Sequence, residues 1–505
     1  MSFVTPRGIG TGIIFSCLAM PALADITAAE LRDQVIGLIE MTGAEVSIES
    51  ENQNGSTLLL DGISITFDVP DEDVEIVLNY PTVALTDISG TVEMTYPNGL
   101  DFTALVTPEG EVTGEFTASM EMDDYVVVFS GSMQDLMMES SATGGAFAVG
   151  MDIPDELSLP ELASGTFGAI ANSLSIKRDG PKLTLKGDAS LKSIAYLADI
   201  TLPDDEGRFT QSGSFEDYNV GFEFDAALIP DPEEILRRGV KILLSLDIGA
   251  AKTEVTGDIP DEGVTIDFAY SSDGTVLDFV MSNDQFRFDV ESSGLSGRFA
   301  MLGAPIPPVE LSWSKLQMGV EVPLSTASAP QPFYTKAIIR DLEINESLWS
   351  MFDPGKVIPR DPATAVVDLS GNVNVLADIM TPQVLDRLDD MDIPPMLPVD
   401  IQLNELTLHA AGAALDGSGS VTFNFANPNT ISGFPAPEGS VSLSLKGGFA
   451  LMDKLVKLGF VPEDATMGIR AMLGAFAKPV GDDHLETKIE VTKEGAVLAN
   501  GQRIQ

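Results

Sequence analysis

The sequence has very little cysteine, histidine and tryptophan. Its 505 residues include one cysteine, two histidines and two tryptophans. Cys17 lies in an N-terminal segment that we expect to be removed, so the mature chain would form no disulfide and burial of apolar surface must stabilise it. Neither His409 nor His484 accompanies a nucleophile motif, and Gly-x-Ser-x-Gly, the phosphate-binding loop and His-x-x-x-His pairs are absent. We therefore predict no catalytic residue, no metal ligand and no cofactor.

Basic residues are also scarce. The chain has 28 Lys and Arg against 77 Asp and Glu, a formal net charge of −49. This charge repels nucleic acid, so we predict no nucleic-acid partner. Acidic turns such as Asp71–Asp73 and Asp204–Glu206 lack the alternating ligands and central glycine of a calcium loop. With 77 Asp and Glu, a carboxylate-dependent hydrolase is a further functional hypothesis, since two acidic side chains can act as a catalytic pair. We favour it least, because enzymes that act on sugars use aromatic surfaces to bind them and this chain has only two tryptophans.

An apolar run without charge occurs near the N-terminus. Arg7 is the only charge before an apolar run from Gly8 to Met20, and Ala22 and Ala24 are the small residues that a signal peptidase requires before Asp25. The run is short against the roughly twenty residues that span a bilayer. We predict a signal peptide over residues 1–24, cleaved on export to the periplasm, and no transmembrane segment in the mature chain.

Most of the mature chain alternates apolar and polar residues with period two, which is typical of strands with one buried face. Clear examples are Val264, Ile266, Phe268; Phe286, Phe288, Val290; Val421, Phe423, Phe425; and Val441, Leu443, Leu445. Turn signals such as Ser272–Gly274 separate the strands. The pattern predicts a mainly β fold: an elongated, curved antiparallel β-sheet assembly, either groove-like or a closed sandwich.

A few short helices punctuate the strands. Thr27 and Glu30 form a capping box for an N-terminal helix that ends at Gly43. A second helix is predicted after Asp231-Pro232, with Leu236, Val240, Leu243 and Leu244 on one side, and shorter ones at 346–352 and 382–391. Near the C-terminus we predict a helix pair, 451–459 and 462–476, and then a β-hairpin of 485–492 and 496–504. Residues 25–505 read as one continuous β-rich domain, with possible subdivision at proline-rich stretches near 305–330 and 394–398.

The one-sided strands predict a large apolar inner face. Methionine adapts its shape to irregular partners, so a groove that contains it suits acyl chains, although the same residues also fill ordinary cores. The candidate groove residues are Met120, Met122, Met133, Met137, Phe268, Phe286, Phe288, Phe423 and Phe425. A basic cluster of Lys177, Arg178, Lys182 and Lys186 is the candidate contact for an anionic headgroup; pairing of these residues with nearby carboxylates is the alternative.

The C-terminal residues carry a family resemblance. Gly447-Gly448, Leu451–Leu455, Gly459–Glu463, Met472–Gly474 and Val497–Ile504, together with the signal peptide, resemble the exported alphaproteobacterial proteins of domain of unknown function family 2125. A looser resemblance, through the closing helices, hairpin and Asn500-Gly501, is to the AsmA-like envelope proteins. The looser resemblance implies a long curved sheet with an apolar groove and a link to lipid traffic.

Two functional hypotheses follow. The first is a periplasmic, non-enzymatic envelope protein that binds lipid or another amphiphile in an apolar groove of the sheet. The second is a structural or protein-interaction module of the cell envelope, in which the same apolar face is a closed core without ligand. The shape of the inner surface discriminates between them, because an open trough favours a ligand and a filled interior favours a scaffold.

Overall fold

The computed structural model describes residues 26–40, 43–68, 74–108, 114–153, 157–202, 207–227, 239–303, 305–380, 387, 394–425 and 435–504. The predicted signal peptide, with Ala22, Ala24 and Asp25, lies outside the described residues. The α-helices are α1 (Ala28–Glu40), α3 (Glu346–Phe352), α5 (Gly448–Lys457) and α6 (Glu463–Phe476), and a 3-10 turn η2 covers Pro260–Glu262.

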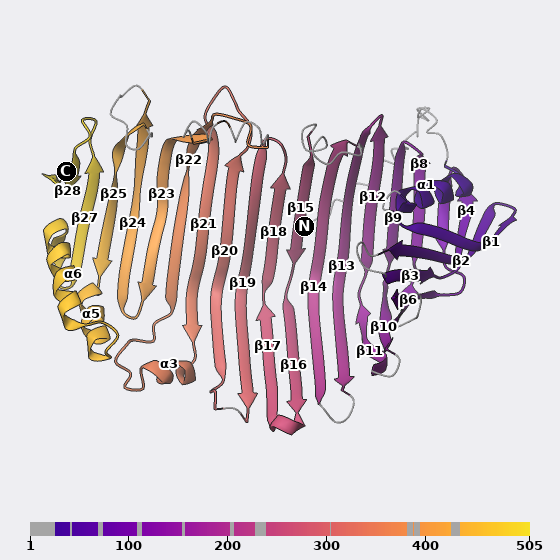
Figure 1. Ribbon diagram of the computed structural model, residues 1–505, viewed down its shortest axis with the longest axis horizontal. Coiled ribbons are helices and arrows are strands. Elements are labelled where there is room, and N and C mark those ends of the chain that lie inside the picture. The colour runs from indigo at the N-terminus through magenta and orange to yellow at the C-terminus, as the bar shows by residue number, and fades with distance from the viewer. Residues whose placement is uncertain are drawn as a thin grey trace, which may run out of the picture.

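The described strands form one antiparallel sheet, which confirms the predicted fold class (Figure 1). The first half contains β1 (Glu45–Asn54), β2 (Thr57–Asp68), β3 (Val74–Tyr80), β4 (Val83–Ile88), β5 (Thr91–Thr95), β6 (Leu100–Pro108), β7 (Gly114–Asp123), β8 (Val126–Ser132), β9 (Asp135–Ala142), β10 (Gly144–Ile153), β11 (Leu157–Phe167), β12 (Ile170–Asp179), β13 (Lys182–Thr201) and β14 (Arg208–Ala227). The second half contains β15 (Lys241–Ile248), β16 (Ala251–Ile259), β17 (Val264–Ser272), β18 (Gly274–Met281), β19 (Gln285–Leu302), β20 (Val309–Pro323), β21 (Gln331–Ile344), β22 (Ala363–Val375), β23 (Met396–Ala410), β24 (Ala413–Asn424), β25 (Ala436–Lys446), β26 (Lys478–Gly481), β27 (His484–Val491), β28 (Val497–Ala499) and β29 (Gln502–Arg503).

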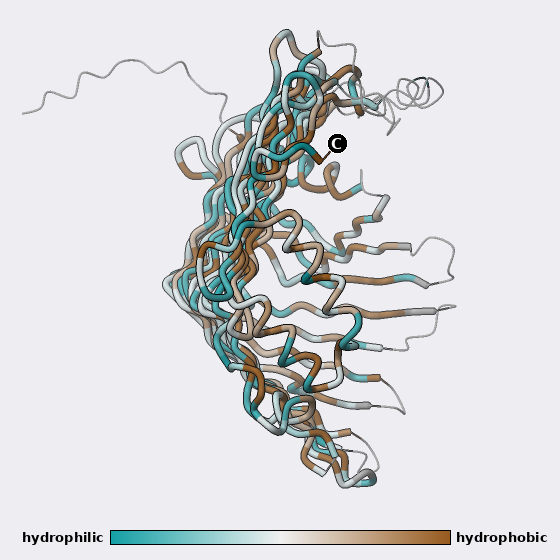
Figure 2. The backbone as a smooth tube through the Cα atoms, turned by 90° about the vertical axis from the view of Figure 1, so that its left-hand side faces the viewer, coloured by the Kyte–Doolittle hydropathy of each residue, from teal (hydrophilic) through white to brown (hydrophobic). Residues whose placement is uncertain are grey.

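A crease runs along most of the sheet and divides it into two arms. The upper arm contains β4, β5, β8, β9, β12, β15 and β18, and the lower arm contains β3, β6, β7, β10, β11, β16 and β17 (Figure 1). Long strands such as β13, β14, β19 and β20 belong to both arms: β13, for example, pairs with β12 over 182–191 and with β11 over 194–198. Figure 2 looks along the sheet and shows the bent profile that results.

Left-handed backbone residues lie on the crease. Asp217 in β14, Gly294 in β19 and Asp341 in β21 have φ values of 50°, 56° and 53°. A left-handed residue interrupts the extended ladder and turns the strand, as a β-bulge does. The sheet therefore bends where these residues stand side by side with the hairpin turns of the shorter strands.

Helices lie at both ends of the sheet. The predicted capping box of α1 is present: the Thr27 amide donates to Glu30 Oε2 at 3.0 Å, and the Glu30 amide donates to Thr27 Oγ1 at 3.3 Å. Leu31 of α1 packs into a cluster of buried apolar residues, with Leu60 and Val127. At the other end, α5 and α6 precede a hairpin of β27 and β28, so the predicted N-terminal helix, C-terminal helix pair and terminal hairpin are all confirmed.

One predicted helix is wrong in its second half. Residues 228–238 lie outside the described residues, but Lys241–Ile248 form strand β15, which pairs with β14 and β18. Ile242, Leu244 and Leu246 occupy every second position and share one face of the sheet, whereas Leu243, Ser245 and Asp247 share the other. Two partner strands satisfy this segment's backbone. The predicted helix at 346–352 is confirmed as α3, whereas the one at 382–391 lies outside the described residues except for Arg387.

The sheet continues through both proline-rich stretches. Pro305–Pro308 lies in the connection between β19 and β20, and these two strands are paired from Gln285↔Pro323 to Phe299↔Val309. The second stretch leads into β23, which pairs with β22 and β24. None of the helices in the described part of the chain combines the length and the apolar composition needed to cross a membrane.

Candidate ligand-binding trough

One face of the sheet is apolar across nearly its whole length. Residues that pair directly across strands share a face, so each register defines a row of side chains. One such row on the upper arm contains Met138, Leu174, Gly187, Phe222, Leu244, Phe279, Phe288, Val320, Thr335, Leu369, Leu403, Gly419, Val441 and Ile489. The neighbouring row faces the other way and contains Met137, Ser175, Lys186, Glu223, Leu243, Val280, Arg287, Glu321, Tyr334, Ser370, Gln402, Ser420, Ser440 and Glu490.

The apolar face continues across the crease onto the lower arm. A lower-arm row contains Met120, Phe147, Gly165, Tyr196, Gly213, Thr253, Tyr270, Gly297, Leu311 and Ile344. The apolar positions of a long strand change parity at the crease: in β19 they are Phe286, Phe288 and Val290 before Gly294, and Leu295, Gly297 and Phe299 after it. Because the left-handed residue shifts the alternation by one, the parity change keeps both arms apolar on the same side. We call this continuous face the lining.

The lining is on the concave side of the crease. Leu295, Ser272 and Ser292 lie on the lining beside the crease and are 6%, 5% and 9% exposed, whereas the side chains of Lys192 and Asp217 at the crease are 67% and 54% exposed. A cavity of about 310 Å³ is bounded by α1 and by lining residues of both arms. In Figure 2 the C-terminal helices also lie within the angle of the bend. The two arms and the end helices therefore form a trough.

Large apolar side chains on the lining remain open to solvent. Phe222, Met318 and Phe268, from three different strands, are 38%, 55% and 38% exposed. Tight burial of large side chains is concentrated under α1. The described residues thus show an open lining along the middle of the sheet instead of a closed sandwich.

Aromatic rings cover glycines of neighbouring strands on the lining. A Cβ at Gly187 would lie 2.4 Å from Phe222 Cε1, and one at Gly165 would lie 2.8 Å from Phe147 Cε1. Tyr196 occupies the same position over Gly213. Each ring fills the space that the missing side chain leaves, which is how sheets keep glycines packed and makes the lining smooth.

The structure brings six of the nine predicted groove residues onto the lining: Met120, Met122, Phe268, Phe286, Phe288 and Phe423. The other three lie elsewhere. Met133 is in the turn between β8 and β9, Met137 faces the opposite side from Met138, and Phe425 follows the last residue of β24. Composition alone could not separate Met137 from Met138, because one residue of register exchanges the two faces.

The predicted basic cluster is divided between the two faces. Lys177, Lys182 and Lys186 belong to convex rows; Lys177 pairs with Asp135 at 3.6 Å and Lys182 with Asp225 at 2.7 Å. Arg178 pairs across strands with Leu183, so it is on the lining, at the upper rim. The four residues therefore do not form one headgroup site.

Charge is concentrated on the convex face. Around Asp289, burial alone would raise the carboxyl pKa, but hydrogen bonds from Tyr334 and Arg287 and the charge of Lys336 outweigh it and lower this pKa. Burial and the bond to Asp289 raise the pKa of Tyr334 to about 12. This cluster ties β19 to β21 on the outside of the trough.

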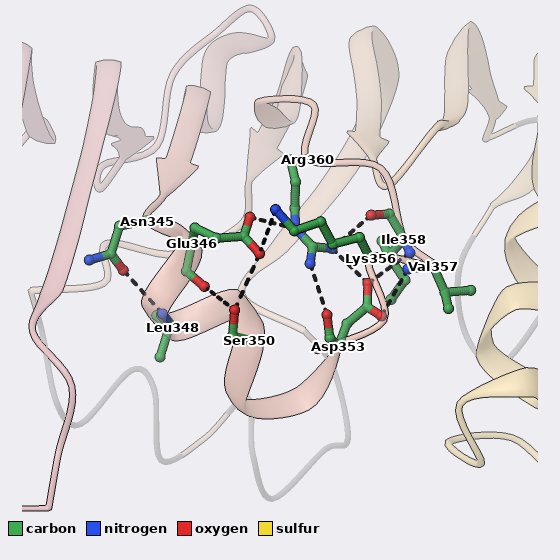
Figure 3. A network of polar contacts seen from close by, with 9 residues as sticks. All are labelled: Asn345, Glu346, Leu348, Ser350, Asp353, Lys356, Val357, Ile358 and Arg360. Atoms are coloured by element: carbon green, nitrogen blue, oxygen red, sulfur yellow. Dashed lines mark hydrogen bonds and ion pairs between the residues drawn. The ribbon is translucent and has the colours of Figure 1, made fainter.

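A polar network fastens α3 below the sheet (Figure 3). Asp353 is fully buried and accepts hydrogen bonds from the amides of Val357 and Ile358 at 2.9 and 2.8 Å and from Arg360 Nη1 at 2.6 Å. Burial alone would raise the pKa of Asp353, but these donors, led by Arg360, lower it to about 2. The Arg360 guanidinium also donates to Glu346 Oε2 and to the carbonyl oxygens of Asp353 and Ile358, and it stacks on the Trp349 ring at 4.5 Å. The network holds the α3 loop in place.

Each histidine ring contacts a polar side chain of the neighbouring strand. His409 Nε2 lies 2.8 Å from Asp416 Oδ1, and His484 Nε2 lies 3.0 Å from Ser444 Oγ, on separate strand pairs of the convex face. Within the described residues no group of three or more His, Cys, Asp and Glu side chains is placed to hold a metal ion.

Comparisons with known proteins add no relative: no family model, curated protein or solved structure matches this chain.

Proposed function

We propose that the trough binds the hydrocarbon chains of lipids or other amphiphiles. The supporting observation is the lining itself. From β12 to β27 the described lining carries one charged side chain, Arg178, in a protein of 77 acidic and 28 basic residues. A contiguous exposed apolar surface of this extent is costly in water and marks an interaction site in soluble proteins.

The dimensions of the lining suit several chains. The row from Met138 to Ile489 crosses fourteen strands at about 4.8 Å each, a contour of roughly 60 Å. One acyl chain fills half of a hydrocarbon core of about 30 Å, so it is about 15 Å long. Each CH₂ group withdrawn from water contributes about 0.8 kcal/mol, which for a dozen groups is about 10 kcal/mol before ordering costs.

The proposal includes the compartment predicted from the N-terminus. An exported protein of the envelope meets lipids outside the cytoplasm, and the looser resemblance to AsmA-like proteins agrees with lipid binding. The alternative, a scaffold with a closed core, requires that the lining be covered, whereas Phe222, Met318 and Phe268 are open to solvent in the described structure.

Native mass spectrometry of the full chain, purified from a host that exports it, tests the proposal. We expect retained lipid and saturable binding of a fluorescent fatty acid. Met318→Asp puts a carboxylate on the lining and should lower the amount of bound lipid, whereas Gln317→Asp puts the same charge on the convex face of the same strand and should not. A wild-type protein that retains no lipid and binds no fatty acid would remove the proposal.

A further inference from the structure

The inference concerns Arg178 and rests on the proposed function. Arg178 is the penultimate residue of β12, and its backbone amide donates to Gln134 O at 2.7 Å. Its cross-strand partner on β13 is Leu183, which is 7% exposed, and the next lining row of the same strands contains Ile176 and Leu185. The guanidinium therefore stands at the rim of the upper arm, directly above apolar lining.

Arg178 has no anionic partner in the described structure. Its neighbours Lys177 and Lys182 each pair with an aspartate on the convex face. Arg178 forms none of the ion pairs found among the described residues, and its Nε is buried without a hydrogen-bond acceptor. A buried donor without an acceptor is unfavourable, and more so when the group is charged. An oxyanion brought by a ligand would satisfy it.

We propose that Arg178 binds the oxyanion of an amphiphile's headgroup, a carboxylate or a phosphate, while the hydrocarbon chain lies on the lining below it. A planar guanidinium offers paired donors that match either group. β12 begins at the crease with Ile170, and the eight residues from there to Arg178, at about 3.4 Å each, span roughly 27 Å. This distance is long enough for a whole hydrocarbon chain. The trough is therefore selective for anionic amphiphiles at this position, although the protein's net charge is strongly negative.

Paired probes separate this inference from the proposed function. The probes are palmitate against hexadecanol, and dodecyl phosphate against dodecanol, measured by displacement of a fluorescent fatty acid ester from the full chain. We expect Arg178→Gln to weaken binding of both anionic probes by roughly tenfold or more and to leave the alcohols unchanged. Lys177→Gln, one residue away on the convex face, should change neither.

The outcomes are distinct. If the wild-type protein binds all four probes and Arg178→Gln weakens none, or weakens acids and alcohols alike, Arg178 is no headgroup site but the trough stands. If the wild-type protein binds none of them, the proposed function falls and this inference falls with it. A larger loss for palmitate or for dodecyl phosphate identifies which oxyanion the site takes.

Discussion

Substitution of Gly294 tests whether the crease depends on a left-handed residue. Gly294 has φ 56°, and a Cβ there would lie 2.0 Å from Asp273 Oδ2 and 2.3 Å from Asp273 Cγ. The left-handed backbone costs a residue with a Cβ about 1–2 kcal/mol, and displacement of Asp273 adds to it. We therefore expect Gly294→Ala to destabilise the protein by about 2–3 kcal/mol.

Gly297 supplies a matched control on the same strand. A Cβ at Gly297 meets only Leu311 Cδ1, at 3.7 Å, which is an ordinary contact. Because glycine within a strand costs about 0.5–1 kcal/mol relative to alanine, Gly297→Ala should be neutral or slightly stabilising. Each variant adds one methyl group to the same strand, so the position of the glycine decides whether the stability rises or falls.

Denaturant unfolding followed by circular dichroism, with hydrogen exchange of residues 285–302, measures both variants. The exchange data localise the effect, because a sheet this long need not unfold in one step. Adding Asp273→Gly to Gly294→Ala should recover the part of the loss that comes from the clash and leave the backbone part. Equal losses for the two alanine variants would refute the proposed cause of the crease.

Three further outcomes are expected. The folded-state pKa of Asp353, about 2, is below its ordinary value of 3.8, so the ionised carboxylate stabilises the folded protein above pH 4 and this contribution is lost as pH falls toward 2. The difference in thermal midpoint between wild type and Asp353→Asn should therefore shrink over that interval, and a constant difference would contradict this. Asp217 has φ 50°, so Asp217→Gly should change the free energy of unfolding by no more than about 1 kcal/mol, whereas the β-branched Asp217→Val should lower it clearly. Equal thermal midpoints for the two variants would contradict this expectation. Leu31→Ala should cost about 3 kcal/mol and release α1 to proteolysis, whereas Val35→Ala, at a position 40% exposed, should cost far less; equal protease sensitivity would argue against α1 as the end cover.

Strands and helices with strong local signals were predictable. The period-two segments became β17, β19, β24 and β25, and the Thr27–Glu30 capping box starts α1, because these patterns depend on residues close in sequence. The helix predicted with Leu236, Val240, Leu243 and Leu244 on one side overlaps the start of β15, because the apolar residues of 240–244 fit both periods. Pairing with β14 and β18, which are distant in sequence, decided in favour of a strand.

The candidate site was predictable in kind but not in detail. Methionines and phenylalanines on alternating strands indicated an apolar face, yet Met137 lies on the convex side and Met138 on the lining. Arg178 could not be distinguished from Lys177 by composition. The sequence does contain a signal of the crease, because the apolar positions of β19 change parity across Gly294. That change indicates a continuous lining only when the left-handed backbone of Gly294 is known.

The sequence by itself determined that this protein is a mainly β chain with one-sided strands, since side-chain alternation is a property of each strand alone. Only the tertiary structure decided that the apolar sides join into the concave face of a bent sheet. It also decided that Arg178 is the one charge on the described lining from β12 to β27. The physical reason is that register and left-handed residues assign every side chain to a face, and both are set by contacts between segments far apart in the chain.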